Sequence, residues 1–115
     1  MKVPVVINGS LTLNFTVDSG AADVSIPADV VTVLMRTGTL TISDFLGTQN
    51  YRLADGSVVP SKVFRIRTLM VGDRVIENVT GSMAGVEGSL LLGQSFLSRF
   101  TSWSIDNKRQ VLVLQ

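Results

Sequence analysis

One acidic turn at the end of an alternating segment constrains this chain more than any other feature. Residues 11–17 alternate between apolar and polar side chains, and this period of two is typical of a half-buried β-strand. The segment leads directly into Asp18-Ser19-Gly20-Ala21. Because Gly20 lacks a Cβ, the backbone can bend sharply there. The sequence therefore predicts a carboxylate at a strand end, beside a small hydroxyl, which is how a catalytic acid is presented.

The composition limits the chemistry that the chain can perform. Its 115 residues suffice for a buried core, and we expect residues 1–115 to form a single domain. The absence of cysteine and histidine excludes disulfides, thiol nucleophiles, histidine-based triads and most zinc sites. The acidic residues are scattered, so we expect no metal site and no cofactor. A hydrolase of this composition must use carboxylates, or lysine together with serine.

Charge and hydropathy exclude further classes of protein. The formal net charge is +1, and hydrophobic residues make up 45% of the chain, which is too apolar for a disordered segment. The sequence contains no basic cluster and no aromatic stacking platform, so nucleic acid is not an expected partner. Apolar runs are short and interrupted, so we expect neither a transmembrane helix nor a signal peptide.

Short apolar segments separated by turn signals predict an all-β fold, as in small barrels and sandwiches. Strands are expected over residues 3–7, 11–17, 24–26, 63–71, 75–84, 90–92, 103–106 and 111–114. Asn8-Gly9 predicts a tight hairpin between the first two strands, and Asp55-Gly56 predicts a second hairpin over residues 51–59. Residues 39–44 fit either a strand or an extended loop. The first and last strands either pair between subunits or close a barrel within one chain.

Two short helices interrupt the strands. The first is expected over residues 27–36, with Pro27 in its first turn, Asp29 at its positive end and Gly38 as its stop. The second is expected over residues 94–100.

Two motifs together resemble a known family. Asp18-Ser19-Gly20-Ala21 resembles the Asp-Ser/Thr-Gly-Ala signature of aspartic proteases. Far downstream, residues 90–97 (Leu-Leu-Leu-Gly-Gln-Ser-Phe-Leu) resemble the two apolar residues, glycine and short helix that support the catalytic turn in these enzymes. The ending, residues 100–106 and 111–114, is similar to that of bacterial retropepsin-like proteases. The resemblance covers roughly residues 3–114 and points to the retropepsin-like aspartic proteases, in the clan of pepsin and the retroviral proteases.

The resemblance implies a retropepsin-like acid protease barrel with one or two short helices, which supplies half of a two-fold active site. Hydrolysis by carboxylates needs two of them sharing one proton. The chain has a single Asp-Ser-Gly, so the implied enzyme is a homodimeric aspartic endopeptidase, in which the Asp18 carboxylates of two chains activate a water nucleophile. Its implied partners are a peptide or protein substrate and a second copy of the chain.

Residue roles follow from the same resemblance. Asp18 is the catalytic acid and base, and Ser19 reaches toward the backbone of the partner chain. The residues that support the catalytic turn are Ser19, Gly20, Ala21, Leu91, Leu92 and Gly93. The substrate-binding residues are Asp23, Leu53, Ala54, Asp55 and Gly56, the last four in a hairpin that acts as a flap over the peptide.

The chain departs from the viral retropepsins at two positions. Ala22 stands where those enzymes have an acidic residue, and Gln94 stands where they have an arginine. In the viral enzymes these two residues form an ion pair that braces the dimer. The brace is therefore missing as a unit, and the dimer of this chain is expected to be weak or differently built.

Other interpretations remain open beside the protease. The fold also suits an inactive module that binds peptides or proteins, and an unrelated structural barrel is a third possibility. Tyr51 is most simply a packing residue, and Arg65 and Arg67 are most simply the solvated face of a strand. Asp23 is either a cleft residue or a solvated turn acid. Bacterial relatives are often membrane-tethered, so an anchor outside this chain and a periplasmic location are expectations from the resemblance.

Overall fold

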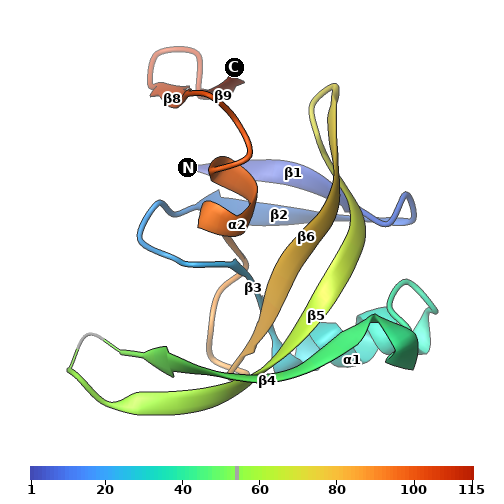
Figure 1. Cartoon of the computed structure of the whole chain (residues 1–115). Coiled ribbons are helices and arrows are strands. Elements are labelled where there is room, and N and C mark those ends of the chain that lie inside the picture. The colour runs from blue at the N-terminus through green and yellow to red at the C-terminus, as the bar shows by residue number, and fades with distance from the viewer. Residues whose placement is uncertain (54) are drawn as a thin grey trace.

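The computed structural model describes residues 1–53 and 55–115, and Figure 1 shows its elements in chain order. The strands are β1 (Lys2–Ile7), β2 (Leu11–Val17), β3 (Val24–Pro27), β4 (Phe45–Arg52), β5 (Val58–Val71), β6 (Arg74–Ala84), β7 (Leu91–Leu92), β8 (Trp103–Asp106) and β9 (Val111–Leu114). The helices are α1 (Ala28–Arg36), the 3₁₀ helix η1 (Ile42–Asp44) and α2 (Gln94–Leu97). The prediction of an all-β fold with short helices is confirmed.

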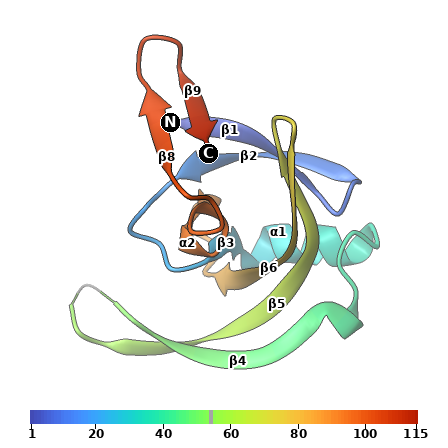
Figure 2. The ribbon, with the colours of Figure 1, turned by 45° about the horizontal axis from the view of Figure 1, so that its top comes forward.

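Most of the strands close into a barrel. The strand order is β1-β2-β7-β3-β6-β5-β4, and a further pairing of β1 with β5 joins the two sides (Figure 2). This closure leaves β4 outside the ring, hydrogen-bonded to β5. The hairpin of β8 and β9 forms a separate two-stranded sheet near the N-terminus of the chain (Figure 2). Of the two terminal strands, β1 is therefore one of the strands that form the barrel, whereas β9 pairs with β8.

Strand β5 takes part in both the barrel and an outer hairpin. Its first half pairs with β4, from Val58 opposite Arg52 to Phe64 opposite Phe45. Its second half pairs with β6 and, near its end, with β1. The predicted hairpin over residues 51–59 is thus only the tip of a much longer one. The local turn signal located the turn, but the lengths of the strands depend on partners elsewhere in the chain.

The core follows from the alternation of side chains. In β1, Val3, Val5 and Ile7 point inward and are buried, while their neighbours Lys2 and Pro4 are exposed. Three phenylalanines, Phe15, Phe64 and Phe96, are fully buried among these residues and bring together β2, β5 and α2. Burying one such ring contributes roughly 1.5–3 kcal/mol relative to an exposed one.

A glycine in β6 makes room for one of these rings. A Cβ added to Gly81 would lie 2.5 Å from Cε2 of Phe64, which is closer than atoms can approach. Gly81 pairs with Phe64 across β5 and β6 and with Val24 across β3 and β6. The missing side chain lets the aromatic ring cross the strand at the point where three strands meet.

Helix α1 covers the barrel with one face. Val31 and Leu34 are buried, whereas Thr32 and Val33 are exposed. Pro27, predicted in the first turn, instead ends β3 and occupies the N-cap position, where its side chain makes no capping hydrogen bond. Helix α2 is also shorter than the predicted residues 94–100, because it ends at Leu97 and the chain then turns.

The segment 39–44 contains a helix, so the prediction of a strand or extended loop is wrong for its second half. Asp44 caps the start of η1, because the backbone N–H of Thr41 donates to Asp44 Oδ2 at 3.0 Å. The backbone N–H of Asp44 donates to the carbonyl of Thr41 at 3.0 Å, which is the 3₁₀ hydrogen bond of the turn. Asp44 is only 1% exposed. A carboxylate this deep needs compensating partners.

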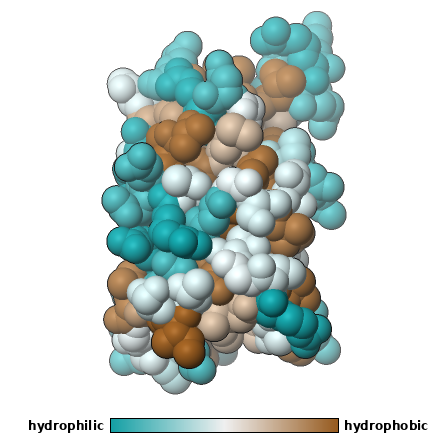
Figure 3. All heavy atoms as spheres, turned by 90° about the vertical axis from the view of Figure 1, so that its right-hand side faces the viewer, coloured by the Kyte–Doolittle hydropathy of each residue, from teal (hydrophilic) through white to brown (hydrophobic). Residues whose placement is uncertain are grey.

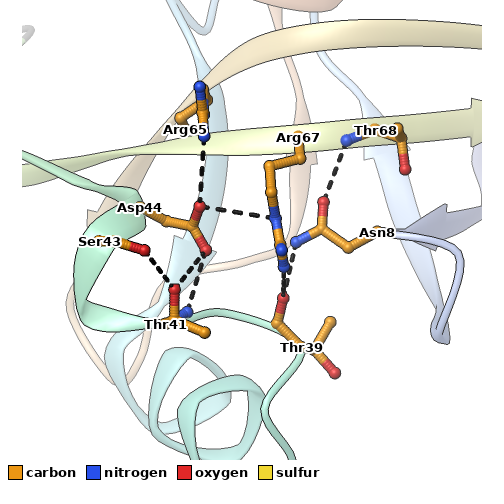
Figure 4. A network of polar contacts seen from close by, with 8 residues as sticks. All are labelled: Asn8, Thr39, Thr41, Ser43, Asp44, Arg65, Arg67 and Thr68. Carbon is orange, nitrogen blue, oxygen red and sulfur yellow. Dashed lines mark hydrogen bonds and ion pairs between the residues drawn. The ribbon is translucent and has the colours of Figure 1, made fainter.

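Two arginines of β5 provide those partners (Figure 4). Arg67 Nε lies 3.5 Å and Arg65 Nη2 lies 3.9 Å from Asp44 Oδ1. The expectation that Arg65 and Arg67 form a simply solvated face is therefore incomplete. Their side chains remain 47% and 44% exposed, but both heads turn toward the buried acid.

The same network reaches the β1–β2 turn. Arg67 Nη2 and Asn8 Nδ2 both donate to the carbonyl of Thr39, at 2.8 and 2.7 Å (Figure 4). The backbone N–H of Thr68 donates to Asn8 Oδ1 at 3.0 Å. Three separate segments are thus tied together at the base of the β4–β5 hairpin.

The face shown in Figure 3 carries apolar side chains in separate small groups between polar ones. Among the described residues, no helix is both long enough and apolar enough to cross a membrane.

Candidate active site

Asp18 directly follows β2 and begins a tight turn. The backbone N–H of Gly20 donates to Asp18 Oδ1 at 2.9 Å, and the backbone N–H of Ala21 donates to the carbonyl of Asp18 at 3.3 Å. Asp18 is half-buried, whereas Ser19 and Gly20 are exposed. A Cβ on Gly20 would lie 3.3 Å from Asp18 Oδ1, tighter than usual, so glycine leaves the carboxylate room beside its own turn.

The two motifs of the sequence meet at this turn. Strand β7 runs parallel to β2, with Leu91 opposite Thr16 and Leu92 opposite Val17. The ladder continues one step further, because the backbone N–H of Asp18 donates to the carbonyl of Leu92 at 3.1 Å. The structure therefore brings together Asp18 and Leu92, which lie far apart in the chain.

Gly93 packs closely against the backbone of the turn. A Cβ on Gly93 would lie 2.3 Å from the carbonyl oxygen of Asp23 and 2.6 Å from that of Ala21. Both neighbours are backbone atoms, so they cannot rotate away as a side chain would. Only glycine fits between β7 and the acidic turn, which explains why the downstream motif needs glycine at this position.

The first two residues of α2 also form hydrogen bonds to the turn and the residue after it. The backbone N–H of Gln94 donates to the carbonyl of Ala21 at 2.8 Å, and that of Ser95 donates to the carbonyl of Ala22 at 2.9 Å. The side chain of Gln94 adds a third bond, from Nε2 to the carbonyl of Ser19 at 2.9 Å. At position 94, where the viral enzymes have an arginine, the neutral amide of Gln94 thus binds the turn within one chain.

Ser95, in α2, joins two strands through its side chain, and sequence reasoning missed it. Its Oγ accepts from the backbone N–H of Val24 at 2.9 Å and donates to the carbonyl of Thr80 at 2.7 Å. It thereby joins the first residue of β3 to β6. Its position directly after Leu-Leu-Gly-Gln was visible in the sequence, but nothing local indicates a partner 71 residues away.

Asp23 closes the turn and has an unexpected partner. The hydroxyl of Tyr51, in β4, donates to Asp23 Oδ2. Burial raises the pKa of Tyr51 to about 12, and the hydrogen bond to the Asp23 carboxylate adds to the shift. Tyr51 is therefore more than the packing residue that the sequence indicated, and Asp23 is half-buried and bonded, unlike a freely solvated turn acid.

Three of the predicted flap residues, Leu53, Asp55 and Gly56, lie in the turn between β4 and β5. The backbone N–H of Gly56 donates to the carbonyl of Leu53 at 3.0 Å, and Gly56 has a φ of +88°, which favours glycine. The backbone N–H and the hydroxyl of Ser57 donate to Asp55 Oδ1 at 2.9 and 2.6 Å, and these bonds lower the pKa of Asp55. Ala54 lies outside the described residues. Within the part of the chain that is described, these bonds stay inside the hairpin and none reaches Asp18.

Other features of the described chain do not add to this site. A cavity of about 300 Å³ lies between β1, the β5–β6 turn and β9, and its lining includes none of the predicted site residues. Over residues 1–53 and 55–115, no group of three or more acidic, histidine or cysteine side chains is arranged to hold a metal ion.

A family model identifies the chain. Residues 3–99 match the model described as "gag-polyprotein putative aspartyl protease". The chain belongs to this aspartyl protease family. No curated protein matches the sequence.

A solved structure shows the same fold as this aspartyl protease family member. It is the crystal structure of a retropepsin-like aspartic protease from Rickettsia conorii, with a TM-score of 0.70 and 20% sequence identity. The match covers 98% of the present chain and 79% of the Rickettsia chain. The resemblance to retropepsin-like aspartic proteases and the predicted barrel are both confirmed.

Proposed function

We propose that this aspartyl protease family member is an active endopeptidase. In the proposed reaction, the Asp18 carboxylates of two identical chains activate a water molecule that hydrolyses a peptide bond. The observation that supports the proposal is the turn at Asp18, which is held in place by four hydrogen bonds between residues 18–22 and residues 92–95. A rigidly held carboxylate is what general acid–base catalysis requires.

The chemistry needs two carboxylates that share one proton. Two like charges a few ångströms apart cannot both ionise easily, so one Asp18 stays protonated while the other is ionised. The ionised Asp18 carboxylate takes a proton from the water molecule while the water oxygen attacks the carbonyl carbon of the peptide bond. The protonated Asp18 carboxyl group donates its proton to the carbonyl oxygen. The carboxyl group that took its proton from water then protonates the amide nitrogen of the resulting diol, while the other carboxylate takes a proton from a diol hydroxyl. The C–N bond breaks to give a carboxylic acid and an amine, and the two Asp18 groups again share one proton.

A symmetric dimer supplies the second carboxylate. The chain has one Asp-Ser-Gly turn, and its exposed residues Ser19 and Gly20 leave the turn accessible to a second copy. A two-fold axis at this point pairs the same surface of each chain with itself. The β4–β5 hairpin then covers the peptide, and its exposed apolar side chains Leu53, Val58 and Val59 suit contact with a substrate.

The decisive experiment compares Asp18→Asn with the unchanged chain on a mixture of peptides. We expect cleavage to disappear in Asp18→Asn while the circular dichroism spectrum stays the same. Asp73→Asn, in the turn between β5 and β6, serves as the matched control and should cleave normally. Cleavage that survives Asp18→Asn would refute the mechanism.

Dilution tests whether the site is shared. If two chains build one site, specific activity falls as the protein is diluted below the dissociation constant of the dimer. A specific activity independent of concentration would contradict a shared site. Peptide binding without any cleavage, at concentrations where the dimer is formed, would instead identify a binding module on the protease fold.

A further inference from the structure

The outer half of the β4–β5 hairpin lacks a third strand. The last pair between β5 and β6 joins Val63 to Ser82. Beyond it, residues 58–62 pair with β4 alone, from Lys62 opposite Thr48 to Val58 opposite Arg52. A two-stranded ribbon is only marginally stable in water. The position of this half therefore depends on contacts back to the barrel.

Tyr51 makes such a contact. It lies in the outer half of β4, opposite Val59, and its hydroxyl donates to Asp23 Oδ2 across 28 residues of sequence. In the described residues of the outer hairpin (46–53 and 55–62), the other side-chain hydrogen bonds join Ser57 to Asp55 within the turn. The Tyr51 hydroxyl is thus the polar link from this ribbon to the rest of the chain.

The acceptor belongs to the segment that carries Asp18. Asp23 ends the loop between β2 and β3, and its backbone oxygen packs against Gly93 at the base of the acidic turn. The outer ends of β4 and β5 and this loop lie on the same side of the molecule in both ribbon views (Figures 1 and 2). A bond to Asp23 therefore orients the hairpin relative to the catalytic turn itself.

The chemistry of Tyr51 and Asp23 makes the hydrogen bond between them strong. A neutral phenol donating to a carboxylate forms a charge-assisted hydrogen bond, which is stronger than one between neutral groups. Both side chains are half-buried, so water competes less well for either partner. A phenol is protonated throughout the neutral range, so Tyr51 remains a hydrogen-bond donor there.

We propose that Tyr51 is a positioning residue whose hydrogen bond to Asp23 latches the β4–β5 hairpin to the loop that carries Asp18. The latch orients the hairpin before a peptide arrives, so that substrate binding does not have to order it. This role rests on the proposed endopeptidase function, but the latch itself can be measured without any cleavage.

The first test reads Tyr51 directly, because it is the only tyrosine of the chain. At pH 10.5 an ordinary tyrosine is about three-quarters ionised, whereas one with a pKa of about 12 is ionised by only a few per cent. Tyrosinate absorbance at this pH should be low in the unchanged chain and rise several-fold in Asp23→Ala. Equal absorbance in the two proteins would overturn the latch.

The second test measures hydrogen exchange of the hairpin amides at neutral pH. Tyr51→Phe removes the hydroxyl and keeps the ring, so we expect about tenfold faster exchange in residues 46–62 and unchanged exchange in the barrel strands. Gln49→Ala is the matched control, an exposed position on the same strand, and should leave exchange unchanged. Unaltered exchange in Tyr51→Phe would refute the latch, whether or not the chain cleaves peptides.

The third test addresses the positioning role. In Tyr51→Phe the hairpin of the free enzyme is not ordered, so peptide binding must order it and KM should rise about tenfold. Because the hairpin is ordered once the peptide is bound, kcat should change less than twofold. A loosened hairpin with unchanged KM would overturn the positioning role. If the unchanged chain cleaves nothing, the proposed function fails, and the absorbance and exchange results still decide whether the latch exists.

Discussion

Removing the buried carboxylate of Asp44 should destabilise the fold more than removing any exposed acid. Asp44 is 1% exposed, caps η1 through the backbone N–H of Thr41 at 3.0 Å, and lies within 4 Å of both Arg65 and Arg67. Asp44→Ala removes the cap and both ion pairs at once. It also leaves two arginine heads near the site without their counter-charge.

The magnitude follows from these contacts. Loss of a helix cap costs about 1 kcal/mol. Breaking a fully buried ion pair costs roughly 3–5 kcal/mol, but the two arginine side chains are nearly half exposed, so water can solvate them and each pair counts for about 0.5–1 kcal/mol. We expect the free energy of unfolding to fall by about 2–3 kcal/mol in Asp44→Ala. Asp44→Asn keeps the shape and one acceptor oxygen, so its effect should be about half as large.

Urea unfolding followed by the fluorescence of Trp103, the single tryptophan, measures this change. Asp106→Asn is the matched control, because the Asp106–Arg109 ion pair is shorter, at 2.8 Å, but its side chains are 32% and 71% exposed. If burial rather than distance decides the contribution, the control variant should lose far less stability than Asp44→Ala. Equal losses in the two variants, or a loss below about 1 kcal/mol in Asp44→Ala, would contradict this reasoning.

Two further substitutions test the support of the acidic turn. Gly93→Ala places a Cβ 2.3 Å from the backbone oxygen of Asp23, so it should cost about 3 kcal/mol or more and lower activity with stability, as thermal unfolding and a peptide assay would show; a normal melting temperature would contradict the close approach. Ser95→Ala leaves the N–H of Val24 and the carbonyl of Thr80 without their partner, which should cost about 1–3 kcal/mol. Ser95→Thr keeps the hydroxyl and should recover part of this loss in urea unfolding, whereas equal losses in both variants would point to packing instead of hydrogen bonding.

Local sequence patterns predicted most of the elements. Some elements depend only on neighbours within a few positions, so they can be recognised from the sequence alone. Examples are the alternating strand over residues 11–17 and the turns at Asn8-Gly9 and Asp55-Gly56. The errors fell where the outcome depends on distant partners. Residues 42–44 form a helix because Asp44 caps it from a site that two arginines of β5 stabilise, and β4 extends well beyond the predicted hairpin because β5 pairs with it.

The site divides in the same way. The sequence alone determined that one carboxylate follows a strand in an Asp-Ser-Gly-Ala turn, and the motif pair indicated a retropepsin-like protease, which the family model confirms. Only the tertiary structure decided what holds that turn: the oxygen acceptors packed against Gly93, the two strands joined by Ser95, and the tyrosine bonded to Asp23. The physical reason is that a turn is set by the dihedral angles of adjacent residues, whereas a hydrogen bond across the barrel depends on how every strand between its partners packs.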